Sequence, residues 1–192
     1  MALISAAVIL LGISLVVHLW PSGDQAPPSP ALTAAALAAL QAGPDSDRLL
    51  LGELRRQAGS EPGDWRKLSE GARTLYATLW VEEVQRTWTW PAMTTVEQVE
   101  NGSPTLSDAA AAYESLGQPE AAAAMRQLAQ RFAQDHAAYQ AWMDGKKHGA
   151  TTPQPSMQVL EDSAKTAFAQ LKEISARRLD FARSHANDLN LR

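Results

Sequence analysis

Residues 69–88 read SEGARTLYATLWVEEVQRTW and carry the most regular helical pattern in the chain. The apolar side chains recur four residues apart, with two leucines beside that row: Ala72, Tyr76, Trp80, Val84 and Trp88, then Leu75 and Leu79. This spacing places them on one face of an α-helix, wide enough to be the centre of a bundle. We expect Ser69 to cap the helix, and Thr78 and Glu82 to lie on its solvated side.

Further helices are expected on both sides of this segment, and no segment shows the alternation of a strand. The expected ranges are 32–42, 45–58, 93–101, 106–116, 119–145 and one final helix of roughly thirty residues from residue 156. That last helix has residues at three–four spacing: Met157, Leu160, Ala164, Ala167, Leu171, Ile174, Arg178 and Phe181. The predicted fold class is therefore all-α, a helical bundle preceded by one N-terminal transmembrane helix.

The membrane helix is predicted from residues 2–20, which begin at Ala2 and end at Trp20. They read ALISAAVILLGISLVVHLW and contain no Asp, Glu, Lys or Arg. As a helix they would reach about 28 Å, close to the hydrocarbon thickness of a bilayer. No basic residue precedes the run and no small-x-small cleavage site follows it, so we expect a retained anchor rather than a signal peptide.

Residues 21–30 (PSGDQAPPSP) contain four prolines and are expected to be an extended linker. The expected organisation is an anchor at 1–20, this linker, and an all-α domain at 31–192. The first basic residue is Arg48, so almost no Lys or Arg lies near the predicted membrane helix from which the positive-inside rule could decide its orientation. We favour an extracytoplasmic, periplasmic domain, with a domain on the cytoplasmic side as the alternative.

Charge is distributed unevenly along a chain whose formal net charge is −4. Residues 74–125 hold seven acidic residues and only Arg86, a net of −6, whereas residues 126–192 hold ten basic and seven acidic residues, a net of +3. The charged residues are interpreted either as solvated helix faces or as an acidic face that docks a basic partner. The negative total argues against nucleic acid as a partner.

No catalytic or metal-binding motif accompanies these helices. The chain has no cysteine, and none of its four histidines, including His136 and His148, stands at the spacing of a metal site. Adjacent carboxylates such as Glu82 and Glu83 point about 100° apart on a helix and do not converge. We therefore expect no enzyme activity, no cofactor and no metal; convergent carboxylates beside His136 or His148 would favour an enzyme instead.

Two segments within residues 65–132, from Trp65 to Phe132, resemble a widespread helical domain of uncharacterised bacterial proteins that includes a DNA-mimic protein. They are WRKLSEGARTLYATLWVEEV and AAAAYESLGQPEAAAAMRQLAQRF. Positions that match the family pattern are Leu68, Ser69, Arg73, Leu75, Tyr76, Leu116, Gly117 and Ala121 to Ala124. The family's N-G-G-F element is absent, and Gln85 to Trp90 stand in its place. The resemblance implies an all-α fold and a bacterial protein, hence an anchor in the inner (cytoplasmic) membrane.

Two functional hypotheses remain. The first is a membrane-anchored, non-enzymatic helical module that recruits or restrains a protein partner, with the lipid bilayer bound through residues 2–20. The alternative is an acidic inhibitor, or DNA-mimic-like protein, that occupies a basic site on a partner. The candidate partner-binding residues are Glu82, Glu97, Glu100, Asp108, Glu114 and Trp90.

Overall fold

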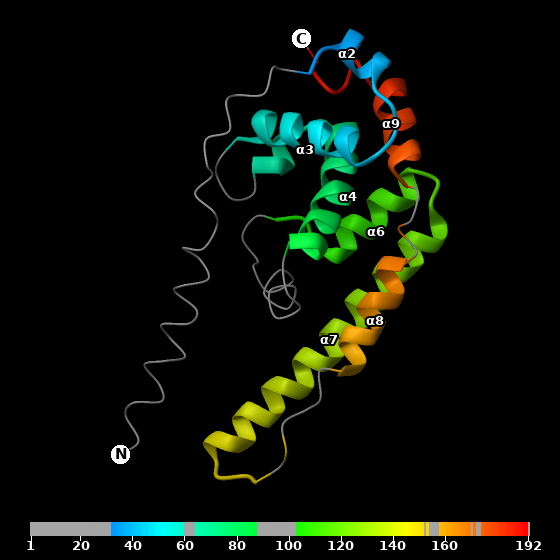
Figure 1. Ribbon diagram of the computed structural model, residues 1–192. Coiled ribbons are helices and arrows are strands. Elements are labelled where there is room, and N and C mark those ends of the chain that lie inside the picture. The colour runs from blue at the N-terminus through cyan, green and yellow to red at the C-terminus, as the bar shows by residue number, and fades with distance from the viewer. Residues whose placement is uncertain are drawn as a thin grey trace. The chain divides into compact units, whose positions relative to one another are not determined.

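The computed structural model describes residues 32–59, 64–87, 103–151, 153, 158–169, 171 and 174–191. The chain divides into two compact units, Met1–Pro30 and Ala31–Arg192, and every described residue belongs to the second (Figure 1). The elements are α2 (Ala34–Ala39), α3 (Pro44–Ala58), the 3₁₀-helix η1 (Asp64–Lys67), α4 (Glu70–Thr87), α6 (Leu106–Ser115), α7 (Pro119–Lys147), α8 (Gln158–Ala169) and α9 (Ile174–Ser184). Within those ranges the chain is helical without strands, which confirms the all-α prediction.

The predicted membrane helix lies outside the described residues. Across residues 32–191, as far as they are described, no helix is long and apolar enough to cross a bilayer. The anchor at residues 2–20 and the linker at residues 21–30 therefore stay predictions, as does the short helix at residues 93–101.

Helix α4 is the central element, as its sequence predicts. Trp80 is 4% exposed and Leu75 is fully buried, so the apolar row faces the interior. Ser69 accepts a hydrogen bond from the backbone N–H of Ala72 at 3.2 Å and so caps the helix. The prediction that Thr78 lies on the solvated side of this helix is wrong, because Thr78 is also fully buried.

Two apolar cores share α4. The α6–α7 core joins the C-terminal half of α4 with α6, α7 and α8, and includes Trp80, Tyr113 and Met125. The α3–α9 core joins the N-terminal half of α4 with α2, α3, η1 and α9, and includes Trp65 and Leu179. Trp65 and Trp80 are therefore core residues, and for Trp80 this confirms its place in the predicted apolar row.

Both ends of the described chain meet at α3. The buried Glu53 accepts a hydrogen bond from the backbone N–H of Leu32 at 3.3 Å. Gln57, one turn later, donates to the backbone oxygen of Leu189 at 2.7 Å. Arg183 of α9 donates to backbone oxygens at the end of α2, including that of Leu40 at 2.5 Å. These contacts hold α2 and the C-terminal turn against the α3–α9 core.

The prediction of one continuous final helix is wrong, because the structure contains two helices there. Leu171 lies between α8 and α9, and its N–H bonds to Phe168 three residues earlier, as in a tight turn. Ala164 and Ala167 of α8 and Ile174 at the start of α9 lie in the α6–α7 core, and Leu179 later in α9 lies in the α3–α9 core. Tertiary packing overrides the local helical preference of this segment.

Two glycines of α3 provide a matched test of backbone strain. Gly59 ends the helix at φ +100°, and a Cβ there would stand 2.7 Å from Oδ2 of the buried Asp64. Gly52 lies inside the helix, and a Cβ there would meet nothing within 4 Å. We predict that Gly59→Ala lowers the free energy of unfolding by roughly 1–3 kcal/mol, whereas Gly52→Ala raises it by about 0.5–1 kcal/mol. Urea unfolding followed by circular dichroism measures both; equal effects would contradict this account of Gly59.

Candidate functional site

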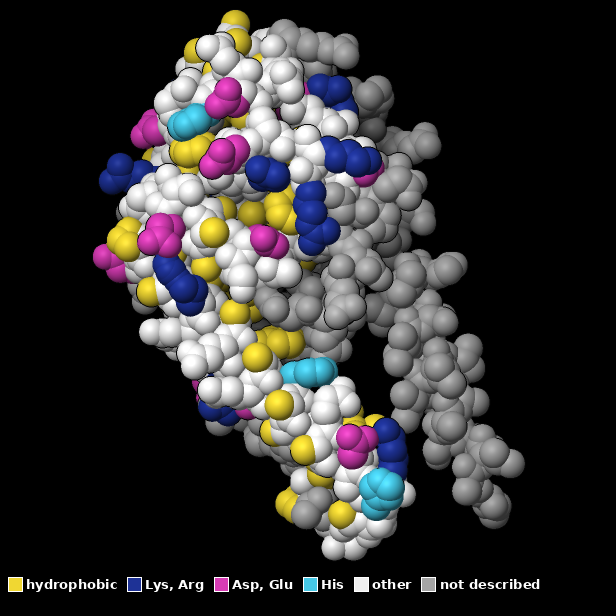
Figure 2. Space-filling model, turned by 180° about the vertical axis from the view of Figure 1, so that it is seen from behind, with side chains coloured by type: hydrophobic (Ala, Val, Ile, Leu, Met, Phe, Trp, Pro, Cys, Tyr) yellow, Lys and Arg dark blue, Asp and Glu magenta, His cyan; other side chains and the backbone are white. Residues whose placement is uncertain are grey.

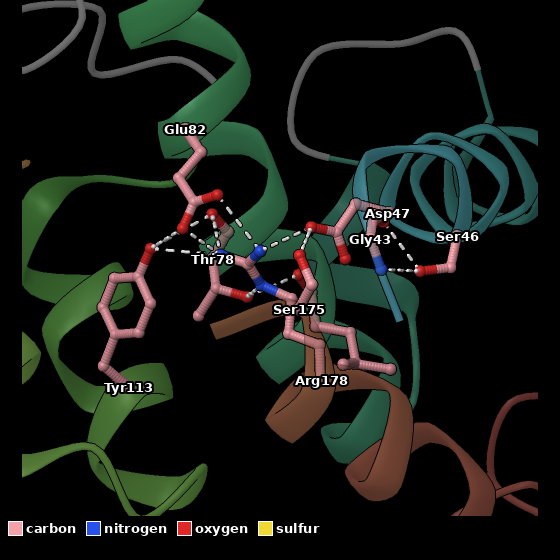
Figure 3. A network of polar contacts seen from close by, with 9 residues as sticks. Gly43, Ser46, Asp47, Thr78, Glu82, Tyr113, Ser175 and Arg178 are labelled. Carbon is pink, nitrogen blue, oxygen red and sulfur yellow. Dashed lines mark hydrogen bonds and ion pairs between the residues drawn. The ribbon is translucent and has the colours of Figure 1, made fainter. Parts of the chain in front are cut away.

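A buried polar network lies where the two cores meet, and Arg178 of α9 is its centre. The Arg178 side chain is 1% exposed, although an isolated guanidinium is very costly to bury. Its Nε donates to Oγ1 of Thr78 at 3.0 Å. Its Nη1 donates to Oε2 of Glu82 at 3.1 Å, and its Nη2 to the other Glu82 oxygen, so the pair is bidentate. Figure 3 shows the guanidinium between the carboxylates of Glu82 and Asp47.

Asp47 brings α3 into the network. Its Oδ2 accepts hydrogen bonds from Nη1 of Arg178 at 3.0 Å and from the hydroxyl of Ser175 at 2.5 Å. Oδ1 of Asp47 is buried, and no group in the described ranges donates to it. The network thus surrounds one guanidinium with two carboxylates, one from α3 and one from α4, and ties both helices to α9.

Tyr113 closes the network from α6. Its hydroxyl donates to Oε1 of Glu82 at 3.0 Å, and Nη2 of Arg178 lies 3.4 Å from the same hydroxyl. Burial, and next to it the negative charge of Glu82, raise the pKa of Tyr113 well above its ordinary value. Although burial disfavours the charged guanidinium, Tyr113, Glu82 and Asp47 together raise the pKa of Arg178. Tyr113 therefore stays protonated and Arg178 stays charged throughout the neutral pH range.

This arrangement suits a structural clamp better than a catalytic centre. Both oxygens of Glu82 bond to Arg178, and Tyr113 donates its proton to one of them. Each Arg178 nitrogen has an oxygen acceptor within the fold. Groups engaged in this way hold helices together, and the exception is the buried Oδ1 of Asp47, to which no described group donates.

The candidate partner-binding acids that the structure describes do not lie together on one surface. Two of them, Glu82 and Asp108, make contacts that stabilise the fold. Glu82 belongs to the Arg178 network, so the expectation that it lies on a solvated face is wrong. Asp108 forms the capping box of α6 with Thr105, accepting from its backbone N–H at 2.9 Å. Glu114 is exposed and pairs with Arg126 at 2.6 Å. The other candidates, Trp90, Glu97 and Glu100, lie outside the described residues.

A groove of about 620 Å³ runs between α7 and α8. Small side chains line most of it, Leu128 and Ala167 are its buried members, and exposed Glu120 and Asp162 contribute carboxylates. The complete lining is Glu120, Ala123, Ala124, Gln127, Leu128, Asp162, Ser163, Thr166 and Ala167. The groove has the dimensions and the apolar walls of a surface that receives protruding side chains of another molecule.

The sequence predicts no metal site, and the residues to examine for one are the histidines and the carboxylates. In the part of the chain that the structure describes, no three His, Asp or Glu side chains are placed to hold a metal ion. His136 is partly buried on α7, and His148 is exposed just after that helix.

Sequence reasoning missed the network although one signal was present. Arg178 occupies an apolar position in the series that runs from Met157 to Phe181. A cation at such a position requires a buried carboxylate partner. The sequence does not identify that partner, because Asp47 and Glu82 are 131 and 96 residues away.

Comparison of the chain with family models, curated proteins and solved structures finds no match. The resemblance of residues 65–132 to a bacterial helical domain therefore stays a prediction.

We predict that Arg178→Met lowers the free energy of unfolding by about 3–5 kcal/mol, because it leaves two carboxylates uncompensated at a buried site. The triple variant Arg178→Met, Asp47→Asn, Glu82→Gln should recover part of this loss. The matched control is Arg177→Met, an exposed neighbour whose replacement should change stability by no more than about 0.5 kcal/mol. Urea unfolding measures all three, and equal losses for the Arg178 and Arg177 variants would show that the network contributes nothing.

Proposed function

We propose that this protein is a membrane-anchored, non-enzymatic helical module that recruits or restrains a protein partner. The observation that carries the proposal is the α7–α8 groove. Most of the side chains that line it are small and uncharged. The internally paired Arg178 network supports it, because that network's polar groups are used to hold helices together.

The proposed partner surface is a helix with a protruding apolar row and basic flanks. Alanines and a threonine in the groove allow close approach of a second backbone, with Leu128 as the apolar floor. Glu120 and Asp162 would attract positive charge at its rim. Helix-in-groove recognition of this kind uses contacts at three–four spacing.

Residues 2–20 supply the location in this proposal. Their length and lack of charged side chains support a single-pass anchor in the bacterial inner membrane, with the domain on the periplasmic side preferred. Residues 21–30 would hold the domain near the bilayer, so a membrane-bound partner would meet it at high effective concentration.

The alternative of an acidic inhibitor has less support among the described residues. Glu82 and Asp108 are engaged inside the fold, which leaves Glu114 and its Arg126 partner at the surface. A steep fall of partner affinity with salt would favour that alternative over the groove.

Site-specific photocrosslinking in intact cells tests the proposed function. A benzophenone amino acid at Gln127, in the groove, should give one discrete larger adduct that remains in the membrane fraction. Ala123→Trp should abolish the adduct by filling the groove, whereas Ala137→Trp, on the exposed part of α7, should leave it. A photoreactive residue at the exposed Gln140 provides the control position. An adduct insensitive to Ala123→Trp, or the absence of any adduct at Gln127, would contradict the proposal.

A further inference from the structure

A second surface combines cations with an aromatic stack. Trp65 of η1 and Tyr76 of α4 stack with ring centroids 6.1 Å apart and planes 11° apart. The guanidinium of Arg66 lies 5.4 Å from the centre of the Trp65 ring, within the range of a cation–π contact. Arg73 donates to the backbone oxygen of Arg66 at 3.4 Å, so it belongs to the same group.

Arg55 joins this group from α3. Helix α3, which carries Arg55, packs against both η1 and α4. Burial raises the pKa of the Tyr76 hydroxyl, and the positive charge of Arg55 opposes that rise. Arg55, Arg66 and Arg73 are all exposed, and none of them takes part in an ion pair among the described residues. We call Trp65, Tyr76 and these three arginines the basic–aromatic patch.

Two of the neighbouring acids, Glu53 and Asp64, are turned inward, whereas Glu70, three residues before Arg73, is exposed. Glu53 is 7% exposed and Asp64 is 9% exposed. Burial alone would raise the pKa of Glu53, but hydrogen bonds from Arg56, Gln57 and the Leu32 backbone outweigh it and hold the pKa below its usual value. Figure 2 shows Lys and Arg side chains spread over the upper part of the domain, with Asp and Glu side chains and hydrophobic side chains among them.

The patch lies beside the point where the chain enters the domain from the proposed anchor. Leu32 bonds to Glu53, and Glu53 also pairs with Arg56, the residue next to Arg55. Residues 21–31, fully extended, would reach about 40 Å at most. Provided that residues 2–20 are the anchor, Leu32 is held within that distance of lipid headgroups, and Leu32 bonds to α3, the helix that carries Arg55.

We propose that the basic–aromatic patch docks the domain on the anionic lipid surface of the bilayer that holds its anchor. Guanidinium groups form paired hydrogen bonds with phosphate. Trp65 is only 7% exposed, so it holds Arg66 through its ring face and does not itself meet lipid, whereas the half-buried Tyr76 is the ring that can meet the headgroup region. Each Arg near an anionic surface strengthens attraction about five-fold, so three amount to roughly a hundredfold. The chain's net charge of −4 disfavours nucleic acid as the occupant. This inference rests on the proposed membrane anchoring and adds an orientation of the domain to it.

Full-length protein in vesicles tests the docking. The chain contains no cysteine, so Gly52→Cys provides a single labelling site, exposed and one turn before Arg55, where a Cβ meets nothing within 4 Å. A fluorophore at residue 52 should be quenched by headgroup-nitroxide lipid in vesicles that contain phosphatidylglycerol, and much less in pure phosphatidylcholine. High salt should remove the quenching. A label at Ala133→Cys, on exposed α7, should be unaffected by lipid charge.

Two charge-matched triple variants decide whether the patch is responsible. Arg55→Gln, Arg66→Gln and Arg73→Gln together should shift the docking equilibrium roughly a hundredfold and abolish the quenching. Lys147→Gln, Lys165→Gln and Arg177→Gln remove the same charge from exposed positions elsewhere and should preserve it. Circular dichroism verifies that each variant is folded.

The outcomes separate this inference from the proposed anchoring. Quenching that is equal in neutral and anionic vesicles, or equally lost in both triple variants, overturns the patch as a lipid-docking surface. Protein that floats with vesicles without quenching at residue 52 overturns the docking and leaves the anchor intact. Protein that does not float with vesicles overturns the anchor and the docking together.

Discussion

The ion pairs of Arg178 with Glu82 and Asp47 join three helices, α3, α4 and α9, at one buried guanidinium. A guanidinium that is 1% exposed requires partners that compensate for its lost hydration. Glu82 from α4 and Asp47 from α3 provide them, and both must approach from fixed directions. The requirement therefore specifies one packing of α3, α4 and α9, whereas apolar contacts between alanine-rich helices would tolerate several. A buried ion pair of this kind is better evidence for specificity than for net stability.

The position of the network explains how the two cores are coupled. Helix α4 contributes Leu75 to one core and Trp80 to the other, and Thr78 binds Arg178 between them. The proposed surfaces depend on this geometry in different degrees. The basic–aromatic patch needs α3 and α4 in register, because Arg55 and Tyr76 come from different helices. The groove depends on α7 and α8, which pack in the α6–α7 core.

Most of the helical architecture could be predicted from the sequence, since it follows from local signals. The apolar row of α4, the Ser69 cap and Pro119 at the start of α7 act within one or two turns. The break between α8 and α9 could not be predicted, because the local apolar pattern continues through Leu171 and Ile174, both buried in the same core as α8, and the turn at Leu171 is a property of the packed fold. The partners of Arg178 could not be predicted either, since Asp47 and Glu82 are 131 and 96 residues away from it in the chain. Likewise, the inward orientation of Glu53 and Asp64, which exposes the basic patch, is a property of tertiary packing.

Native-state hydrogen exchange tests most directly whether Arg178 couples the two cores. In the unmodified protein, the slowest amides of α3 and of α6 should exchange with the same opening free energy, because opening either core breaks the shared network. In Arg178→Met, the amides of α3 should exchange at distinctly lower free energy than those of α6. Equal protection of α3 and α6 in that variant would contradict the account, as would separate opening of the two cores in the unmodified protein.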